Sequence, residues 1–148
     1  AVWRKGYGSD LGRAAAIGGK AAKPEMDRVY AALHAGYDRL ISMVGPGVRL
    51  CDVFHEVVTT VQRYIPEYQR GHVGHSLGCN RFSEEYPFIS PTETSTFEPG
   101  MIFCTEVPYY SSEFNSYNLE DTLLITDNGV ELFSHIPDTL SWTGVSER

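Results

Sequence analysis

The sequence has little of what a nucleic-acid-binding or membrane-spanning protein needs. It carries 12 lysines and arginines against 19 aspartates and glutamates, a formal net charge of -7, and its basic residues form no cluster. A phosphate backbone or an anionic lipid surface would therefore repel it on average. Its apolar runs cover only a few residues, whereas a helix that crosses a bilayer needs roughly 20. We expect no nucleic-acid or membrane partner and a cytoplasmic location.

Cysteine is also scarce. The three cysteines, Cys51, Cys79 and Cys104, are widely spaced and form no CxxC motif. Their odd number and their spacing argue against a disulfide framework and against a zinc knuckle. We predict that all three are reduced residues of the hydrophobic core.

The pattern of apolar residues predicts two helices in the first half of the chain. Residues 24–44 have apolar side chains at spacings of three and four, with Pro24 suited to the first helical position. Residues 52–64 repeat this spacing, with Asp52 as a possible cap and Pro66 as the stop. Because each helix has one polar face, we expect both to lie on the outside of a sheet.

The remaining segments are typical of strands and turns. Residues 2–5 and 11–17 flank a glycine-rich bend, and residues 101–107, 119–126 and 130–133 form the clearest strands of the second half. The sequence has no internal repeat, no low-complexity tract and no linker. Since the chain starts inside a predicted strand, we expect a preceding segment in the parent protein. A length of 148 residues with 42% hydrophobic and 21% charged residues fits one globular domain.

Four residues in the predicted extended segments are potential metal ligands: Asp10, His75, Glu106 and Glu120. Both glutamates stand in apolar surroundings, and a buried carboxylate is costly unless a cation or hydrogen bonds compensate it. One imidazole with several carboxylates suits Mn, Fe, Co or Zn. Taken singly, however, each is more often a turn residue, a solvated edge residue or a satisfied polar group.

Several segments, in order, resemble motifs of the creatinase, aminopeptidase P and methionine aminopeptidase superfamily (M24). They are GYGSDLGR at 6–13, GHSLG at 74–78, FEPGM at 97–101 with the following Thr105-Glu106, LEDT at 119–122 and DNGVEL at 127–132. The resemblance implies the α+β pita-bread fold, a curled, mainly antiparallel sheet with helices on its convex face and the ligands in its concave face. It further implies that residues 1–148 are the C-terminal portion of a single, N-terminally truncated catalytic domain.

The same resemblance implies a dinuclear site of two aspartates, one histidine and two glutamates. Asp10 matches the second aspartate, and His75, Glu106 and Glu120 match the other three ligands, while the first aspartate falls before Ala1. The full-length parent is then expected to bind two divalent ions (Mn, Co, Zn or Fe) and to form a homodimer. This chain alone should hold metals poorly and be inactive, because losing a ligand weakens a closed shell sharply.

Two departures from the family pattern bear on the substrate. Where its peptidases have a second histidine after the ligand loop, this sequence has Phe82 or Ser83, and Asn118 replaces an arginine two residues before the last glutamate. Losing an imidazole removes a proton-transfer or oxyanion partner. His72 is close in sequence and is a candidate donor to the substrate, with a structural role as the alternative.

The resemblance implies a metal-dependent hydrolase of C–N bonds in which Glu106 accepts a proton from a metal-activated water. The first expectation is a Xaa-Pro dipeptidase or aminopeptidase acting on small peptides. The alternatives are a creatinase-like hydrolase or a lyase acting on a small amide-like metabolite, or a catalytically inactive binding module.

Overall fold

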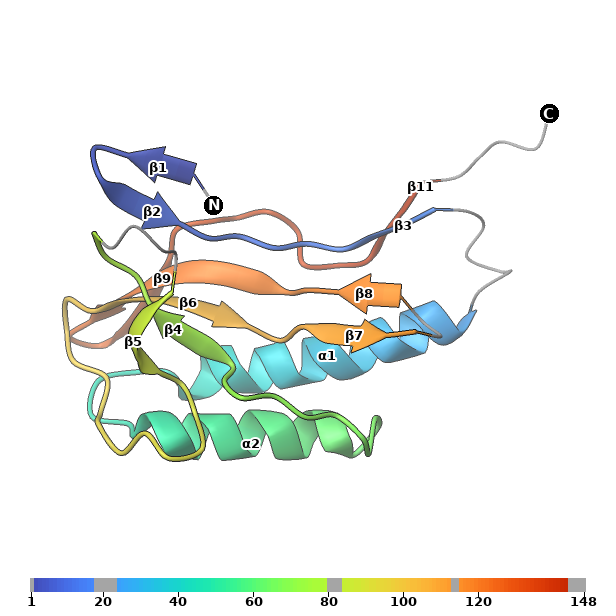
Figure 1. Ribbon diagram of the computed structural model, residues 1–148, viewed down its shortest axis with the longest axis horizontal. Helices are drawn as coiled ribbons and strands as arrows, with labels where there is room; N and C mark the ends of the chain where they lie inside the picture. The colour runs from blue at the N-terminus through green and yellow to red at the C-terminus, as the bar shows by residue number, and fades with distance from the viewer. Residues whose placement is uncertain (1, 18–23, 80–83, 113–114, 144–148) are drawn as a thin grey trace.

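The computed structural model describes residues 2–17, 24–79, 84–112 and 115–143. Two antiparallel helices, α1 (Pro24–Met43) and α2 (Leu50–Gln62), pack side by side and cover one face of a β-sheet (Figure 1). The predicted α+β class and the outer position of both helices are therefore confirmed.

Helix α1 follows the prediction closely. Pro24 is its first residue, and Glu25 and Asp27 lie in its first turn, where carboxylates interact favourably with the helix dipole. Leu33 and Leu40, at the centre of the apolar stripe, are fully buried. Burying that stripe, rather than helix propensity, stabilises such a helix in a protein.

Helix α2 differs from the prediction at both ends. It begins at Leu50, and Asp52 is not its cap but lies in the first turn, paired with Arg49 at 2.9 Å. It ends at Gln62, so Tyr64 lies beyond it with a side chain that is 69% exposed, while Ile65 is buried in its place. The prediction was wrong here because the apolar spacing continues past the point where the helical backbone stops.

The main sheet has five strands, each antiparallel to its neighbours, in the order β10-β9-β6-β4-β5. In chain order the strands are β4 (Gly74–Ser76), β5 (Glu85–Phe88), β6 (Ile102–Glu106), β9 (Glu120–Thr126) and β10 (Gly129–Leu132). Successive side chains of a strand point to opposite faces. Phe103, Leu123 and Ile125 belong to the hydrophobic core shared with the helices, so Cys104, Glu106 and Glu120 point the other way.

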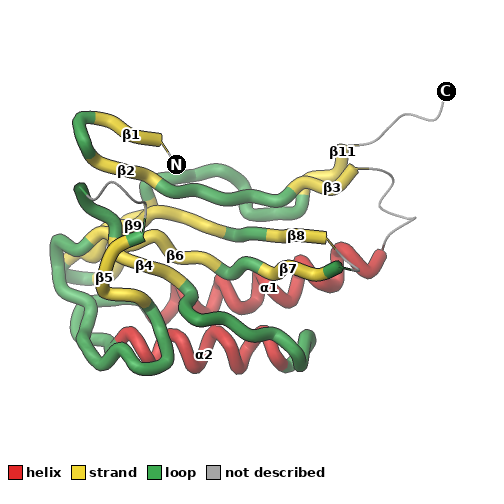
Figure 2. Tube along the Cα trace, in the orientation of Figure 1, coloured by secondary structure: helices red, strands yellow, loops and turns green. Residues whose placement is uncertain are grey.

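In the described part of the chain, three small strand pairs accompany the main sheet (Figure 2). They are β1 (Val2–Arg4) with β2 (Tyr7–Ser9), β3 (Ala15–Ile17) with the parallel β11 (Ser141–Thr143), and β7 (Tyr109–Ser111) with β8 (Asn115–Tyr117). The predicted strand at 11–17 is reduced to Ala15–Ile17, and the predicted bend at 6–8 is a turn at Lys5 and Gly6, both with positive φ.

The three cysteines are free, as predicted, but not all of them are core residues. Cys51 and Cys104 are buried, whereas Cys79 is exposed. The prediction for Cys79 was wrong because its segment leaves the sheet after β4. Among the described residues no helix combines the length and the apolar character that a membrane span requires.

Candidate metal and active site

Three strands bring potential ligands to the sheet face that points away from the helices. Glu106 of β6 stands directly opposite Glu120 of β9 in the antiparallel register. On the other side of β6, His75 of β4 stands opposite Cys104. Opposite residues of an antiparallel pair have Cβ atoms about 5 Å apart. The register alone therefore places an imidazole, a thiol and two carboxylates within one small region.

Asp10 reaches this region through the segment between β2 and β3. Gly12 exchanges two backbone hydrogen bonds with Glu120, at 3.1 and 3.0 Å. The Thr122 hydroxyl binds the backbone of Asp10, two residues before Gly12. It accepts from the Asp10 amide at 3.2 Å and donates to the Asp10 carbonyl at 2.6 Å. A Cβ added to Gly12 would lie 2.7 Å from the Glu120 Oε2 atom. The glycine thus permits the close approach that sets Asp10 beside the sheet.

The ligand atoms of Asp10, His75, Cys104 and Glu120 all lie within 4.8 Å of one another. The imidazole is 2% exposed, and its Nδ1 atom lies 3.1 Å from the Ser76 carbonyl oxygen. A carbonyl acceptor keeps the proton on Nδ1 and leaves the Nε2 lone pair for a metal, an arrangement common at metal sites. The donor set of these four residues fits a divalent transition metal ion.

Glu106 lies next to this group but is engaged elsewhere. Its Oε1 atom is 3.2 Å from the Arg70 guanidinium and 3.3 Å from the His72 Nδ1 atom. The Glu106 residue as a whole is 8% exposed. Of the four ligands predicted from the sequence, the structure therefore brings three into one group and sets the fourth across the strand pair from Glu120.

The site concentrates negative charge in a buried place. Burial raises the pKa of Glu120, and the charges of Asp10 and Glu106 raise it further against the opposing effects of Cys104 and His75. Burial, followed by the charge of Glu120, raises the pKa of the Cys104 thiol. A cation bound among these groups would compensate the cost of burying the carboxylates and the repulsion between them.

The surroundings of His72 shift its imidazole toward the neutral form. Burial lowers the pKa of its imidazole, while the charges of Glu106 and Glu84 oppose that effect. Its ring centroid lies 6.1 Å from that of His75 and 5.2 Å from that of Phe88. A neutral imidazole beside Glu106 can carry a proton on one nitrogen and present it to another group.

Hydrogen bonds from both sides fix Glu120. Asn118 donates from Nδ2 to the Glu120 Oε2 atom at 2.9 Å. On the helix side, Arg13 donates to the Glu120 carbonyl at 2.7 Å and pairs with both carboxylate oxygens of buried Asp121, at 2.8 and 3.0 Å. The hydroxyl of Tyr37 on α1 also donates to Asp121. Strand β9 is thereby tied to α1 and to the segment that carries Asp10.

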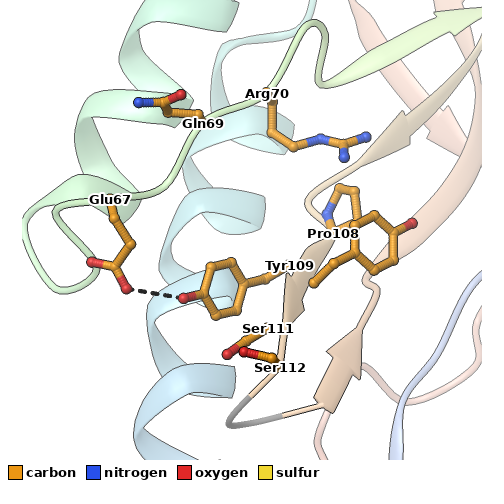
Figure 3. Close-up of a pocket in the computed structure, with 8 residues that line it drawn as sticks. Glu67, Gln69, Arg70, Pro108, Tyr109, Ser111 and Ser112 are labelled. Carbon is orange, nitrogen blue, oxygen red and sulfur yellow. Dashed lines mark hydrogen bonds between the residues drawn. The ribbon is translucent and has the colours of Figure 1, made fainter.

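A pocket of about 350 Å³ lies beside Arg70 (Figure 3). The Arg70 guanidinium carbon lies 5.7 Å from the centroid of the Tyr110 ring, and the Tyr109 hydroxyl donates to Glu67 at 3.0 Å. A second pocket, of about 380 Å³, is lined by His72, Glu84 and Phe88 among others. The two residues that contact Glu106 thus each border a hollow large enough for part of a small substrate.

Three residues that contact the candidate ligands, Cys104, Arg70 and Thr122, were not predicted from the sequence. For Cys104 a signal existed, because residues two apart on a strand share a face and Cys104 stands two residues before Glu106. Arg70 and Thr122 carried no such signal, since their roles depend on contacts between distant segments. Phe82 and Ser83, singled out at the place of the missing histidine, lie outside the described residues.

Comparison with known proteins identifies the family of the chain. The model of metallopeptidase family M24 matches residues 1–127. An uncharacterized peptidase of Staphylococcus saprophyticus is 31% identical over 127 residues, which cover 84% of this chain and 35% of that protein.

Solved structures of related proteins have a similar fold. The dipeptidase PepE of Mycobacterium ulcerans has a TM-score of 0.86 and 26% identity, covering 97% of this chain and 38% of its own. A Xaa-Pro dipeptidase of Bacillus anthracis has a TM-score of 0.83 at 23% identity, covering 94% and 38%. The chain thus spans little more than a third of these relatives' length. Because the family model covers most of the sequence, the chain, with its pita-bread fold, belongs to metallopeptidase family M24.

Proposed function

We propose that the protein containing this chain is a metal-dependent hydrolase of C–N bonds that acts on Xaa-Pro dipeptides or similar small peptides. The observation that carries the proposal is the grouping of Asp10, His75 and Glu120 within 4.8 Å, with Glu106 opposite Glu120. The dipeptidases with the same fold support the substrate class. Since the chain covers 38% of each of them, the proposal concerns the whole protein.

In this proposal Asp10, His75, Glu106 and Glu120 hold two divalent cations, together with a further aspartate from the preceding segment. Bound divalent cations supply Lewis acidity, which polarises a carbonyl and lowers the pKa of water. Glu106 accepts the proton of the attacking water. His72, whose pKa is lowered by burial and whose side chain is 22% exposed, donates a hydrogen bond on the substrate side.

The surroundings of Glu106 favour a substrate with a negatively charged end. Arg70 places a cation at the border of the pocket in Figure 3. A dipeptide has a free carboxylate close to the scissile bond, and guanidinium groups bind carboxylates well. Arg70 is therefore proposed as a residue that orients the substrate carboxylate.

The second candidate is a creatinase-like enzyme acting on a small non-peptide metabolite. Asn118 favours it, because the peptidases of the family commonly have an arginine at that position and Asn118 offers a neutral amide that is already bonded to Glu120. The missing charge alters what the site can bind, while the hydrolytic chemistry of Glu106 stays the same.

The test is hydrolysis by the full-length protein, loaded in turn with Mn, Co and Zn. Xaa-Pro dipeptides and creatine-like amidines are compared as substrates, with metal content measured in parallel. We expect cleavage of the dipeptides and a kcat about 10²- to 10⁴-fold lower in Glu106→Gln at saturating metal, since a general base typically contributes that factor. His55→Ala, on the exposed face of α2, is the control that should retain full activity.

Other outcomes point elsewhere. Turnover of the amidines alone would favour the creatinase-like reading. Less than one equivalent of bound metal under saturating conditions would contradict the enzyme and indicate a binding module. The cytoplasmic location and the homodimer stay predictions.

A further inference from the structure

Cys104 lies on the sheet face that carries the candidate ligands, not on the face that packs against the helices. It lies on β6, two residues before Glu106, so its side chain shares the face of the candidate ligands. It is fully buried, and its Sγ atom lies 3.0 Å from the Glu120 Oε1 atom. Its cross-strand neighbour on β4 is His75. The thiol is therefore set between the imidazole and a carboxylate of the site.

The distances allow one cation to contact the thiol and its neighbours together. Zinc binds sulfur at about 2.3 Å and nitrogen or oxygen at about 2.0 to 2.2 Å, so in its usual tetrahedral geometry two of its ligand atoms lie about 3.3 to 3.8 Å apart. The donor atoms of Cys104, His75, Asp10 and Glu120 lie within 4.8 Å of one another. Small side-chain adjustments would bring all four to bonding distance. Glu106, in contrast, is paired with Arg70, and its Oε1 atom lies 3.3 Å from the His72 Nδ1 atom.

Cys51 shows what an ordinary buried thiol looks like in this chain. It lies on α2, and its Sγ atom is 3.9 Å from the Asp52 Oδ1 atom, on an element that carries none of the candidate ligands. Burial next to a carboxylate is thus common to both residues. Among the described residues, Cys104 but not Cys51 belongs to a group in which an imidazole and carboxylates lie within 4.8 Å of the thiol.

We propose that Cys104 is a metal ligand, so that one cation of the site is bound by nitrogen, oxygen and sulfur. On binding, the Sγ–H proton is released to solvent and the thiolate donates an electron pair to the cation. Thiolate ligands favour Zn and other thiophilic ions, whereas carboxylates alone suit Mn. The site should then prefer Zn or Co over Mn. The inference rests on the proposed function only in requiring that the site binds a divalent cation.

The test uses the full-length protein with Cys79→Ser throughout, because the exposed thiol of Cys79 could bind metal by itself. Co(II) is titrated into this protein, into the same protein with Cys104→Ser, and into the matched control with Cys51→Ser. We expect a near-ultraviolet sulfur-to-cobalt charge-transfer band that is lost in the Cys104 variant and kept in the Cys51 variant. Zn affinity should fall at least about tenfold in the Cys104 variant, the lower bound for loss of an outer-shell partner. Mn affinity should change less.

A second measurement needs no substitution at Cys104. X-ray absorption of the Zn-loaded protein should show a sulfur neighbour at about 2.3 Å. Binding of Co and Zn without a charge-transfer band or a sulfur neighbour would overturn the proposal and leave the thiol as a hydrogen-bond donor to Glu120. Absence of any metal binding would instead contradict the proposed function, so the two failures are distinguishable.

Discussion

Glu120 combines burial with two neighbouring carboxylates, and both raise its pKa above the 4.5 of an exposed glutamate. The folded state therefore binds the Glu120 proton more tightly than the unfolded state does. Its contribution to stability is complete below pH 4.5 and is lost as the pH rises through the folded-state pKa. The loss amounts to about 1.4 kcal/mol for each unit by which the pKa is raised.

We predict that metal-free protein with Glu120→Gln becomes progressively more stable than the unsubstituted protein as the pH rises from 4.5 to neutrality. Urea unfolding in the presence of a chelator measures the difference at each pH. The comparison cancels the titration of groups that do not contact Glu120. A difference that does not change with pH would show that Glu120 has no raised pKa.

At the scale of elements, the site depends on how closely β4 approaches β6. Gly74 has φ +155, and a Cβ added to it would lie 2.5 Å from the Cys104 carbonyl oxygen and 2.8 Å from the Ile89 side chain. Neither the backbone of β6 nor a fully buried isoleucine can move without cost. The absence of a side chain at Gly74 therefore holds His75 at its distance from the β6 and β9 ligands.

Gly74→Ala should lower the free energy of unfolding by about 1 to 3 kcal/mol, the usual cost of overpacking. It should also weaken metal binding, because the strand that carries His75 must shift. Chemical denaturation and metal titration measure the two effects. Gly45→Ala is the matched control, since nothing lies within 4 Å of its added Cβ. Equal behaviour of the two variants would contradict the tight contact between the strands.

At the scale of the whole molecule, the candidate site joins segments that are distant in sequence. The stretch that contains Asp10 is held to β9 through Gly12 and Thr122, and β9 is held to α1 through Asp121 and Tyr37. A cation bound at the site would therefore connect the N-terminal segment, the sheet and, indirectly, the helix layer. Ligands that bind only the folded state stabilise it by mass action.

We predict that saturating Zn or Co raises the stability of the full-length protein by about 2.7 kcal/mol at a free concentration one hundred times the dissociation constant. Thermal unfolding with metal and then with excess chelator measures the gain and its reversal. In His75→Ala the gain should be largely lost. If that variant is stabilised as much as the unsubstituted protein, the metal binds elsewhere.

Much of the architecture was predictable from local patterns. Helix α1 was predicted to within one residue, because Pro24 and the glycines after it mark its ends and its apolar spacing is regular. The strands that carry Glu106 and Glu120 were predicted from their apolar composition. The start of α2 was not, because the residue that precedes the helix, Arg49, makes no side-chain capping hydrogen bond that a sequence pattern could indicate.

By itself, the sequence determined the family, the two helices followed by a mainly β second half, and four of the side chains that could act as ligands, since these follow from local spacing and from motifs in a fixed order. Only the tertiary structure decided which of them meet. It turned Glu106 toward Arg70 and His72 and set Cys104 among the ligands. The reason is that strand register and cross-strand contact join residues far apart in the chain, and no local pattern encodes the distance between them.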